Sequence, residues 1–147
     1  MNKIMRRSKG GKSYFQGRHN WLPYLPPVLA ASLIGTYLDL YFVGKGIYAF
    51  PNRPLSGIFS INIIFTLFGL PLLSMAFLSI SSFLKNREAL IFILILSSIM
   101  TFGEMAAENF KFFAHHPDWK HIYSFIGYNI FFILLYFSFN KLKRRGI

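Results

Sequence analysis

The sequence predicts an all-α membrane protein, a bundle of four transmembrane helices with both termini in the cytoplasm. Hydrophobic residues make up 54% of the 147 residues, and charged residues only 14%. A soluble domain would have about a quarter of its residues charged. The apolar residues also come in four long blocks, each close to the roughly 20 residues that cross a bilayer.

The net charge of +11 does not predict a nucleic-acid partner, because Lys and Arg stand at the two ends of the chain and between the apolar blocks. This placement is typical of the flanks that orient a membrane protein. No nucleic-acid recognition motif accompanies the charge. The chain has no cysteine, which excludes disulfides, thiolate catalysis and Cys-ligated zinc.

Two regions are predicted. Residues 1–20 form a basic cytoplasmic arm, expected to be disordered and to lie on anionic headgroups. Residues 21–147 form the transmembrane domain, with spans at about 26–43, 57–83, 89–110 and 121–139.

The first span, 26–43, begins with Pro26 and Pro27, which suit a first helical turn. Ala31, Gly35 and Asp39 follow at intervals of four residues and therefore share one helical face. Small residues on that face let a second helix approach closely. We therefore expect Asp39 to point at protein and not at lipid.

The second span, 57–83, contains Pro71, which predicts a kink. Asn62 and Thr66 lie on one stripe of this span. The third span, 89–110, must include Glu104 and extend toward Glu108 to reach the length that a bilayer requires. The fourth span, 121–139, ends at a basic cluster.

The distribution of positive charge predicts the orientation. With both termini inside, twelve of the 16 Lys and Arg flank the inner ends of the spans and four lie in the outer loops. In this orientation, polar side chains from all four spans fall in the outer half of the bundle. The residues expected to form a ligand or proton site there are Asp39, Asn62, Glu104, Glu108 and Tyr128.

Asp39 has two interpretations. It can hold the helix register through a hydrogen bond to Asn62 on the second span or to tyrosine side chains, or it can be a ligand or proton site, because an acid inside a span is expensive. We predict that Asp39 contacts the second span near Asn62.

Metal ligation is a weaker hypothesis for the outer end. Glu108, His115, His116 and His121 are the candidate ligands, but no H-E-x-x-H or other diagnostic spacing is present. Alternatively, Glu104 and Glu108 simply reach interfacial water. The sequence therefore predicts no cofactor.

Several short segments resemble a group of small four-span membrane proteins of endospore-forming bacilli. The segments are Tyr37–Asp39, Phe50–Pro54 and Phe59–Asn62, with Trp119, Tyr123-Ser124 and Gly127 in the last third. The resemblance covers roughly residues 30–140. It implies the architecture and a bacterial plasma membrane, and it implies no activity.

The favoured function is an integral plasma-membrane protein without its own catalysis, an accessory or sensing subunit. Its expected partners are the lipid bilayer and a second copy of the chain or another membrane protein. One alternative is a small oligomeric transporter or ion-binding protein that uses Asp39. The other is a membrane-embedded metal-dependent enzyme that uses Glu104, Glu108 and the loop histidines.

Overall fold

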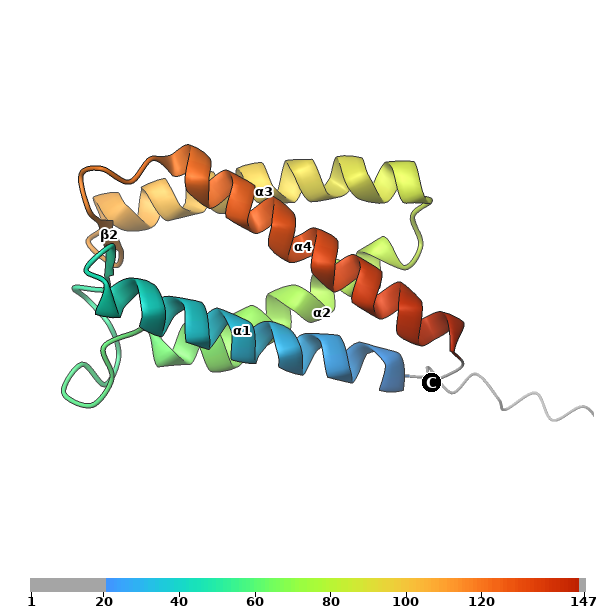
Figure 1. Ribbon diagram of the computed structural model, residues 1–147, viewed down its shortest axis with the longest axis horizontal. Helices are drawn as coiled ribbons and strands as arrows, with labels where there is room; N and C mark the ends of the chain where they lie inside the picture. Colours follow the sequence, from blue (N-terminus) through green and yellow to red (C-terminus); the bar gives the residue numbers. More distant parts are fainter. Residues whose placement is uncertain (1–20, 146–147) are drawn as a thin grey trace, which may run out of the picture.

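The computed structural model describes residues 21–145 (Figure 1). The predicted basic arm, residues 1–20, lies outside the described residues, as do residues 146–147. Over the described range the chain is mostly helical, which confirms the predicted all-α class. The elements in chain order are η1 (Leu22–Tyr24), α1 (Leu25–Gly44), β1 (Tyr48–Ala49), η2 (Phe65–Gly69), α2 (Leu70–Ser81), α3 (Asn86–Asn109), β2 (Ala114–His115) and α4 (His121–Arg144).

Neighbouring helices run in opposite directions. At one end of the molecule the ring of Tyr24, just before α1, lies 4.6 Å from that of Phe139 near the end of α4. At the same end, the Tyr136 hydroxyl of α4 donates to Asn86 Oδ1 at the start of α3, at 3.0 Å. The opposite end carries β1 and β2, and we call it the strand end (Figure 1).

The four helices form two pairs that α4 connects. Helix α1 packs along α2, and α3 packs along α4, which crosses from α3 toward α1 and α2 (Figure 1). Phe77 of α2 and Phe132 of α4 are fully buried at this crossing, with ring centroids 4.8 Å apart. The core of the bundle therefore lies where α4 meets α2, nearer the end opposite the strands.

The small-residue face of α1 contacts the second helical segment, as predicted. Ala31 is buried, and a Cβ placed on Gly35 would collide with the side chain of Leu70. One turn away, Ser32 Oγ donates to the carbonyl oxygen of Thr66 at 2.7 Å, and both residues are buried. The absence of a side chain at Gly35 lets the two helices approach.

The helix in the region of the predicted second span, 57–83, starts later than predicted. Residues 57–62 are not helical, and Asn62 Oδ1 accepts a hydrogen bond from the Phe65 backbone N–H at 3.2 Å. This is the contact that caps a helix N-terminus. The preceding loop is tied by Arg53, whose guanidinium donates to three backbone carbonyls, those of Phe59 at 2.6 Å, Phe50 at 2.8 Å and Ser56 at 3.3 Å.

Pro71 produces a widened turn at the place where a kink was expected. The helix opens with the π-helical segment η2, and the Leu70 N–H bonds to the Phe65 carbonyl, five residues back. Pro71 has no N–H to offer the carbonyl four residues before it. A wider turn before the proline lets later N–H groups reach the freed carbonyls.

Two short extended segments join the loop after α1 to the loop before α4. In β1 and β2, Tyr48 pairs with His115 and Ala49 with Ala114, in antiparallel register. A further bond joins His116 N to the Ile47 carbonyl at 2.8 Å. These bonds fix the position of β2 relative to α1.

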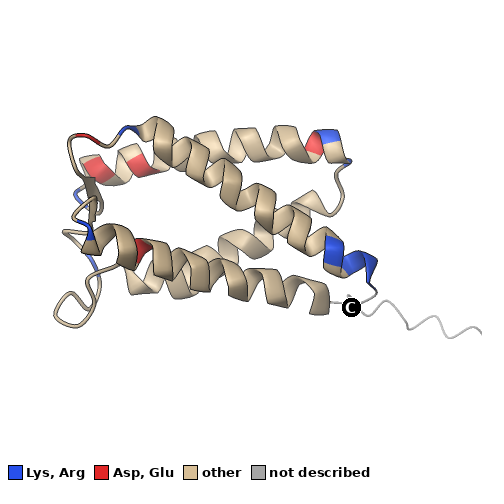
Figure 2. Cartoon of the chain, in the orientation of Figure 1, with Lys and Arg blue, Asp and Glu red and all other residues tan. Residues whose placement is uncertain are grey.

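The outer surface of the helices is suited to lipid. In the described residues, the helical segments Leu22–Gly44, Asn86–Asn109 and His121–Arg144 are long and apolar enough to cross a membrane, and Phe65–Ser81 is apolar but shorter. Charged side chains gather at the two ends, and the middle of the helices carries almost none (Figure 2). This distribution fits a membrane protein.

Candidate functional site

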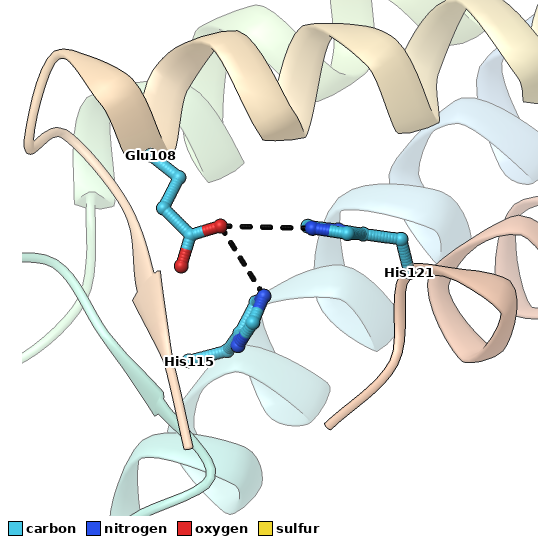
Figure 3. Close-up of side chains that lie close together, drawn as sticks. All are labelled: Glu108, His115 and His121. Atoms are coloured by element: carbon cyan, nitrogen blue, oxygen red, sulfur yellow. Dashed lines mark ion pairs between the residues drawn. The ribbon is translucent and has the colours of Figure 1, made fainter. Parts of the chain in front are cut away.

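Three side chains that are far apart in the sequence meet at the strand end. They are Glu108 in the last turn of α3, His115 in β2 and His121, the first residue of α4 (Figure 3). One nitrogen or oxygen from each lies within 4.8 Å of the other two. The structure thus brings together three of the four residues predicted as candidate metal ligands.

The position of His121 follows from helix geometry. Glu104 and Glu108 lie one turn apart on α3 and so share the face that contacts α4. The imidazole of His121 stands between them, with Nδ1 3.5 Å from Glu104 Oε1 and Nε2 3.7 Å from Glu108 Oε2. Its two ring nitrogens therefore face two different carboxylates.

His115 joins this group and His116 does not, because successive side chains of an extended strand point to opposite faces. His115 Nε2 lies 3.2 Å from Glu108 Oε2, with 13% of the side chain exposed. The His116 side chain is 56% exposed and contacts Asp118 at 3.3 Å. His116 therefore lies outside the site.

The contacts of His115 leave one nitrogen free for a ligand. His115 Nδ1 lies 3.1 Å from the His116 carbonyl oxygen, so Nδ1–H is the donor in this bond. In the neutral ring the other nitrogen, Nε2, carries a lone pair, and this nitrogen lies 3.2 Å from Glu108 Oε2 and is buried without a hydrogen bond. A buried nitrogen of this kind is expensive unless it is paired.

Two of the three separations are close to those of metal ligands. Ligand atoms about 2.0–2.2 Å from a tetrahedral zinc ion lie roughly 3.3–3.6 Å from one another. The Glu108 oxygen lies 3.2 Å from His115 Nε2 and 3.7 Å from His121 Nε2. Two imidazoles and one carboxylate are also the ligand set of many zinc sites that keep a fourth position open.

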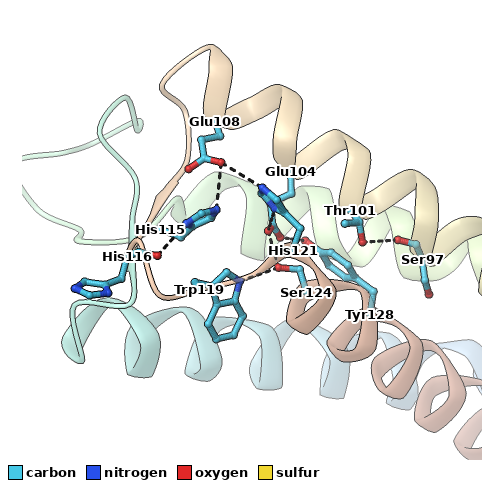
Figure 4. A network of polar contacts seen from close by, with 10 residues as sticks. All are labelled: Ser97, Thr101, Glu104, Glu108, His115, His116, Trp119, His121, Ser124 and Tyr128. Carbon is cyan, nitrogen blue, oxygen red and sulfur yellow. Dashed lines mark hydrogen bonds and ion pairs between the residues drawn. The ribbon is translucent and has the colours of Figure 1, made fainter.

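Glu104 is the most deeply placed acid of the site, with 7% of its side chain exposed (Figure 4). Ser124 Oγ donates to its Oε1 at 2.5 Å, and the Tyr128 hydroxyl donates to its Oε2 at 3.0 Å. The indole Nε1–H of Trp119 donates to Ser124 Oγ at 3.0 Å. Ser124 and Trp119 are not among the residues predicted for the site, although Ser124 follows His121 by nearly one helical turn.

Aromatic rings join the site to α1. Tyr48 of β1 packs against Trp119 at 5.1 Å, and Phe42 of α1 packs against the same indole at 5.6 Å. Burial raises the pKa of the Tyr48 phenol well above its ordinary value, and the charge of Glu104 raises it further. The Tyr48 phenol therefore lines the site and is uncharged at physiological pH.

The two remaining predicted site residues do not join this network. Asp39 is half-buried on α1, and no hydrogen bond or ion pair links it to another residue in the range 21–145. The predicted hydrogen bond between Asp39 and Asn62 is not formed within residues 21–145, and the Asn62 oxygen accepts from the Phe65 N–H at the start of the second helical segment. The predicted polar cluster is thus formed by α3, α4 and β2.

Comparison of the chain with protein-family models, with curated proteins and with solved structures gave no match. The resemblance to four-span proteins of bacilli stays a prediction.

Proposed function

We propose that this protein is a multi-pass plasma-membrane protein that binds a transition-metal ion at the outer end of its helices and acts as a non-catalytic sensing or accessory subunit. The observation that carries the proposal is the convergence of Glu108, His115 and His121. The membrane part of the proposal rests on the three long apolar helices.

A fourth crossing by the shorter helix follows from the arrangement of the others. Helix α1 ends at the strand end, and α3 starts at the opposite end. If both cross the membrane, the chain between them must cross back. Phe65–Ser81 has 17 residues, about 26 Å at the helical rise of 1.5 Å per residue. A hydrocarbon core of roughly 30 Å accommodates such a helix with slight thinning.

The distribution of Lys and Arg supports cytoplasmic termini. The end opposite the strands carries Lys85, Arg87, Lys141, Lys143, Arg144 and Arg145, while the strand end carries Lys45, Arg53, Lys111 and Lys120. Positive flanks face the cytoplasm. The metal site then faces the exterior, where it can exchange ions with the medium.

Reporter fusions test this orientation. Reporters after Arg145 and at Asn86 should report the cytoplasm, and one at Pro117 should report the exterior. A cytoplasmic signal at Pro117 would overturn the orientation.

The ligand set favours zinc and its chemical neighbours over calcium or magnesium. Imidazole nitrogen suits Zn²⁺, Co²⁺, Ni²⁺ and Cu²⁺, whereas Ca²⁺ and Mg²⁺ prefer oxygen ligands. Two of the three converging side chains are histidines. Zinc is therefore the first ion to test.

Binding is a better proposal than hydrolysis. A zinc hydrolase needs a general base beside the metal-bound water. In the described part of the chain, Glu104 lies across the His121 ring from Glu108, and Asp118 contacts His116 away from the site. Neither acid is placed on the metal side of the ring.

Metal analysis of the detergent-purified protein tests the proposal. The unsubstituted chain should bind one zinc equivalent, and excess Mg²⁺ or Ca²⁺ should not displace it. Glu108→Gln, His115→Ala and His121→Ala should each lose stoichiometric binding. His116→Ala is the matched control, because His116 is adjacent to His115 but lies outside the site. Unsubstituted protein that binds no zinc, or equal losses in all four variants, would refute the site.

A further inference from the structure

We infer that Glu104 is a positioning residue of the metal site, whose carboxylate accepts the Nδ1–H of His121 and so presents His121 Nε2 to the ion. This inference rests on the proposed metal-binding function. It adds a fourth side chain to the site and gives it a role other than ligation.

The first step is the position of the His121 ring. Nδ1 lies 3.5 Å from Glu104 Oε1, and Nε2 lies 3.7 Å from Glu108 Oε2. The two carboxylates thus stand on opposite sides of one imidazole (Figure 4). An ion held by His121 Nε2 and Glu108 is separated from Glu104 by the ring, so Glu104 cannot be a ligand to it.

The second step concerns which ring nitrogen of His121 carries the proton. A metal ligand must offer a lone pair, and in the neutral ring the other nitrogen then holds the hydrogen. Metal-bound histidines usually donate that hydrogen to a carboxylate or a backbone carbonyl. His115 Nδ1 meets the second kind of acceptor, the His116 carbonyl, at 3.1 Å. Glu104 is the first kind of acceptor, placed at the equivalent nitrogen of His121.

The third step concerns what holds Glu104 in place. Trp119 Nε1–H can only donate, and it donates to Ser124 Oγ at 3.0 Å. The Ser124 hydroxyl hydrogen is then directed to Glu104 Oε1, at 2.5 Å. Tyr128 fixes the other oxygen at 3.0 Å. Both carboxylate oxygens are therefore oriented before an ion arrives.

The contact between His121 Nδ1 and Glu104 is incomplete in this structure. His121 Nδ1 is buried, and at 3.5 Å from Glu104 it does not complete a hydrogen bond. His115 Nε2, on the metal side, is likewise buried without a hydrogen bond. An ion bound to Nε2 of both rings would give His115 Nε2 the partner that it lacks. We expect it also to draw His121 into its hydrogen bond with Glu104.

The competing explanation is that Glu104 only pins α3 to α4 through Ser124 and Tyr128. Two variants separate the roles. Glu104→Gln keeps the shape of the side chain but replaces the charged acceptor that His121 needs. Tyr128→Phe removes one bond from the same carboxylate and leaves the His121 side of it intact.

Zinc affinity gives the first readout. The Trp21→Phe background leaves Trp119 as the sole tryptophan, because the chain has two. Its indole is bonded to Ser124 beside the site, so its fluorescence can follow a zinc titration. Glu104→Gln should weaken zinc affinity about 10–100-fold, which is typical of the loss of an outer-shell partner. Tyr128→Phe removes only one of the two bonds that hold Glu104, so it should weaken the affinity less than Glu104→Gln does, and thermal unfolding should show both variants folded.

A second readout does not depend on the stability of any variant. Nitrogen-15 NMR of the histidine rings in the unsubstituted, zinc-loaded protein should show His121 bound through Nε2 and protonated at Nδ1. Cobalt can replace zinc for a visible spectrum, whose bands should shift more in Glu104→Gln than in Tyr128→Phe.

The outcomes separate the failure of the metal site from the failure of the role of Glu104. If the unsubstituted protein binds no zinc, the metal site and this inference are both overturned. If it binds zinc and Glu104→Gln binds it equally well, the metal site stands and the role of Glu104 is overturned. Binding through His121 Nδ1 in the NMR spectrum would also overturn the role of Glu104.

Discussion

Gly35 gives the sharpest test of how α1 and α2 pack. A Cβ at this position would overlap the end of the Leu70 side chain, which is 8% exposed and has little room to move. Overpacking of this kind costs about 1–3 kcal/mol. Removing a glycine from a helix interior returns about 0.5–1 kcal/mol. We therefore expect Gly35→Ala to lower the free energy of unfolding by up to about 2.5 kcal/mol.

Two other helical glycines are matched controls. A Cβ at Gly103 or Gly127 would meet no atom within 4 Å. Alanine there should leave stability equal or raise it by about 0.5–1 kcal/mol. Equilibrium unfolding in detergent, followed by circular dichroism, measures all three variants. The loss at Gly35 should shrink in the Leu70→Val background, because that change shortens the colliding side chain.

The stability of Gly35→Ala relative to Gly103→Ala tests how closely the two helices approach at Gly35. If Gly35→Ala is as stable as Gly103→Ala, the two helices do not approach closely at this point. The packing of the small-residue face of α1 against Leu70 would then be wrong.

Three further substitutions test contacts elsewhere. Ser32→Ala leaves the buried carbonyl of Thr66 without its 2.7 Å donor. It should cost about 1–3 kcal/mol in detergent unfolding, and a cost no larger than that of the exposed control Ser98→Ala would contradict the bond. Asp39→Leu should not lower the free energy of unfolding, because Asp39 has no hydrogen bond in the range 21–145, and a loss above about 1 kcal/mol would reveal a missed partner. Arg53→Lys keeps the charge but not the fork that binds three carbonyls, so limited proteolysis should cut this loop faster, and unchanged cleavage would contradict the clamp.

The parts of the fold set by composition could be predicted from the sequence. The first, third and fourth spans were expected at 26–43, 89–110 and 121–139, and the corresponding helices are Leu25–Gly44, Asn86–Asn109 and His121–Arg144. Long apolar runs bounded by charges determine such segments. The fourth helix continues to Arg144, beyond the predicted end of the fourth span at 139, because Lys and Arg continue a helix as well as they end one.

The second span shows where composition is insufficient. Residues 57–62 are largely apolar, but Phe59 belongs to the loop that Arg53 closes, and Asn62 caps the helix that comes after them. The sequence does not distinguish an asparagine that caps a helix from one that lies inside a span.

The site was predictable only in part. Glu104 and Glu108 were expected to share a face, because their spacing of four residues requires it once α3 is a helix. The meeting of His115 with Glu108 depends on the pairing of β2 with β1, which comprises two residues in each strand. Pairing so short leaves no periodic pattern in a sequence.

The pairing of β1 with β2 also determines how the site would respond to a deletion in the loop. Two histidines stand next to each other at the end of β2, and hydrogen-bond register alone decides which one meets Glu108. A slip of one residue turns every side chain of a strand to the other face. Loss of a single residue before His115 would carry His116 into its place and keep the ligand set chemically the same. His116 can therefore replace His115 as a ligand, and a one-residue deletion in this loop would leave the set of one glutamate and two histidines unchanged.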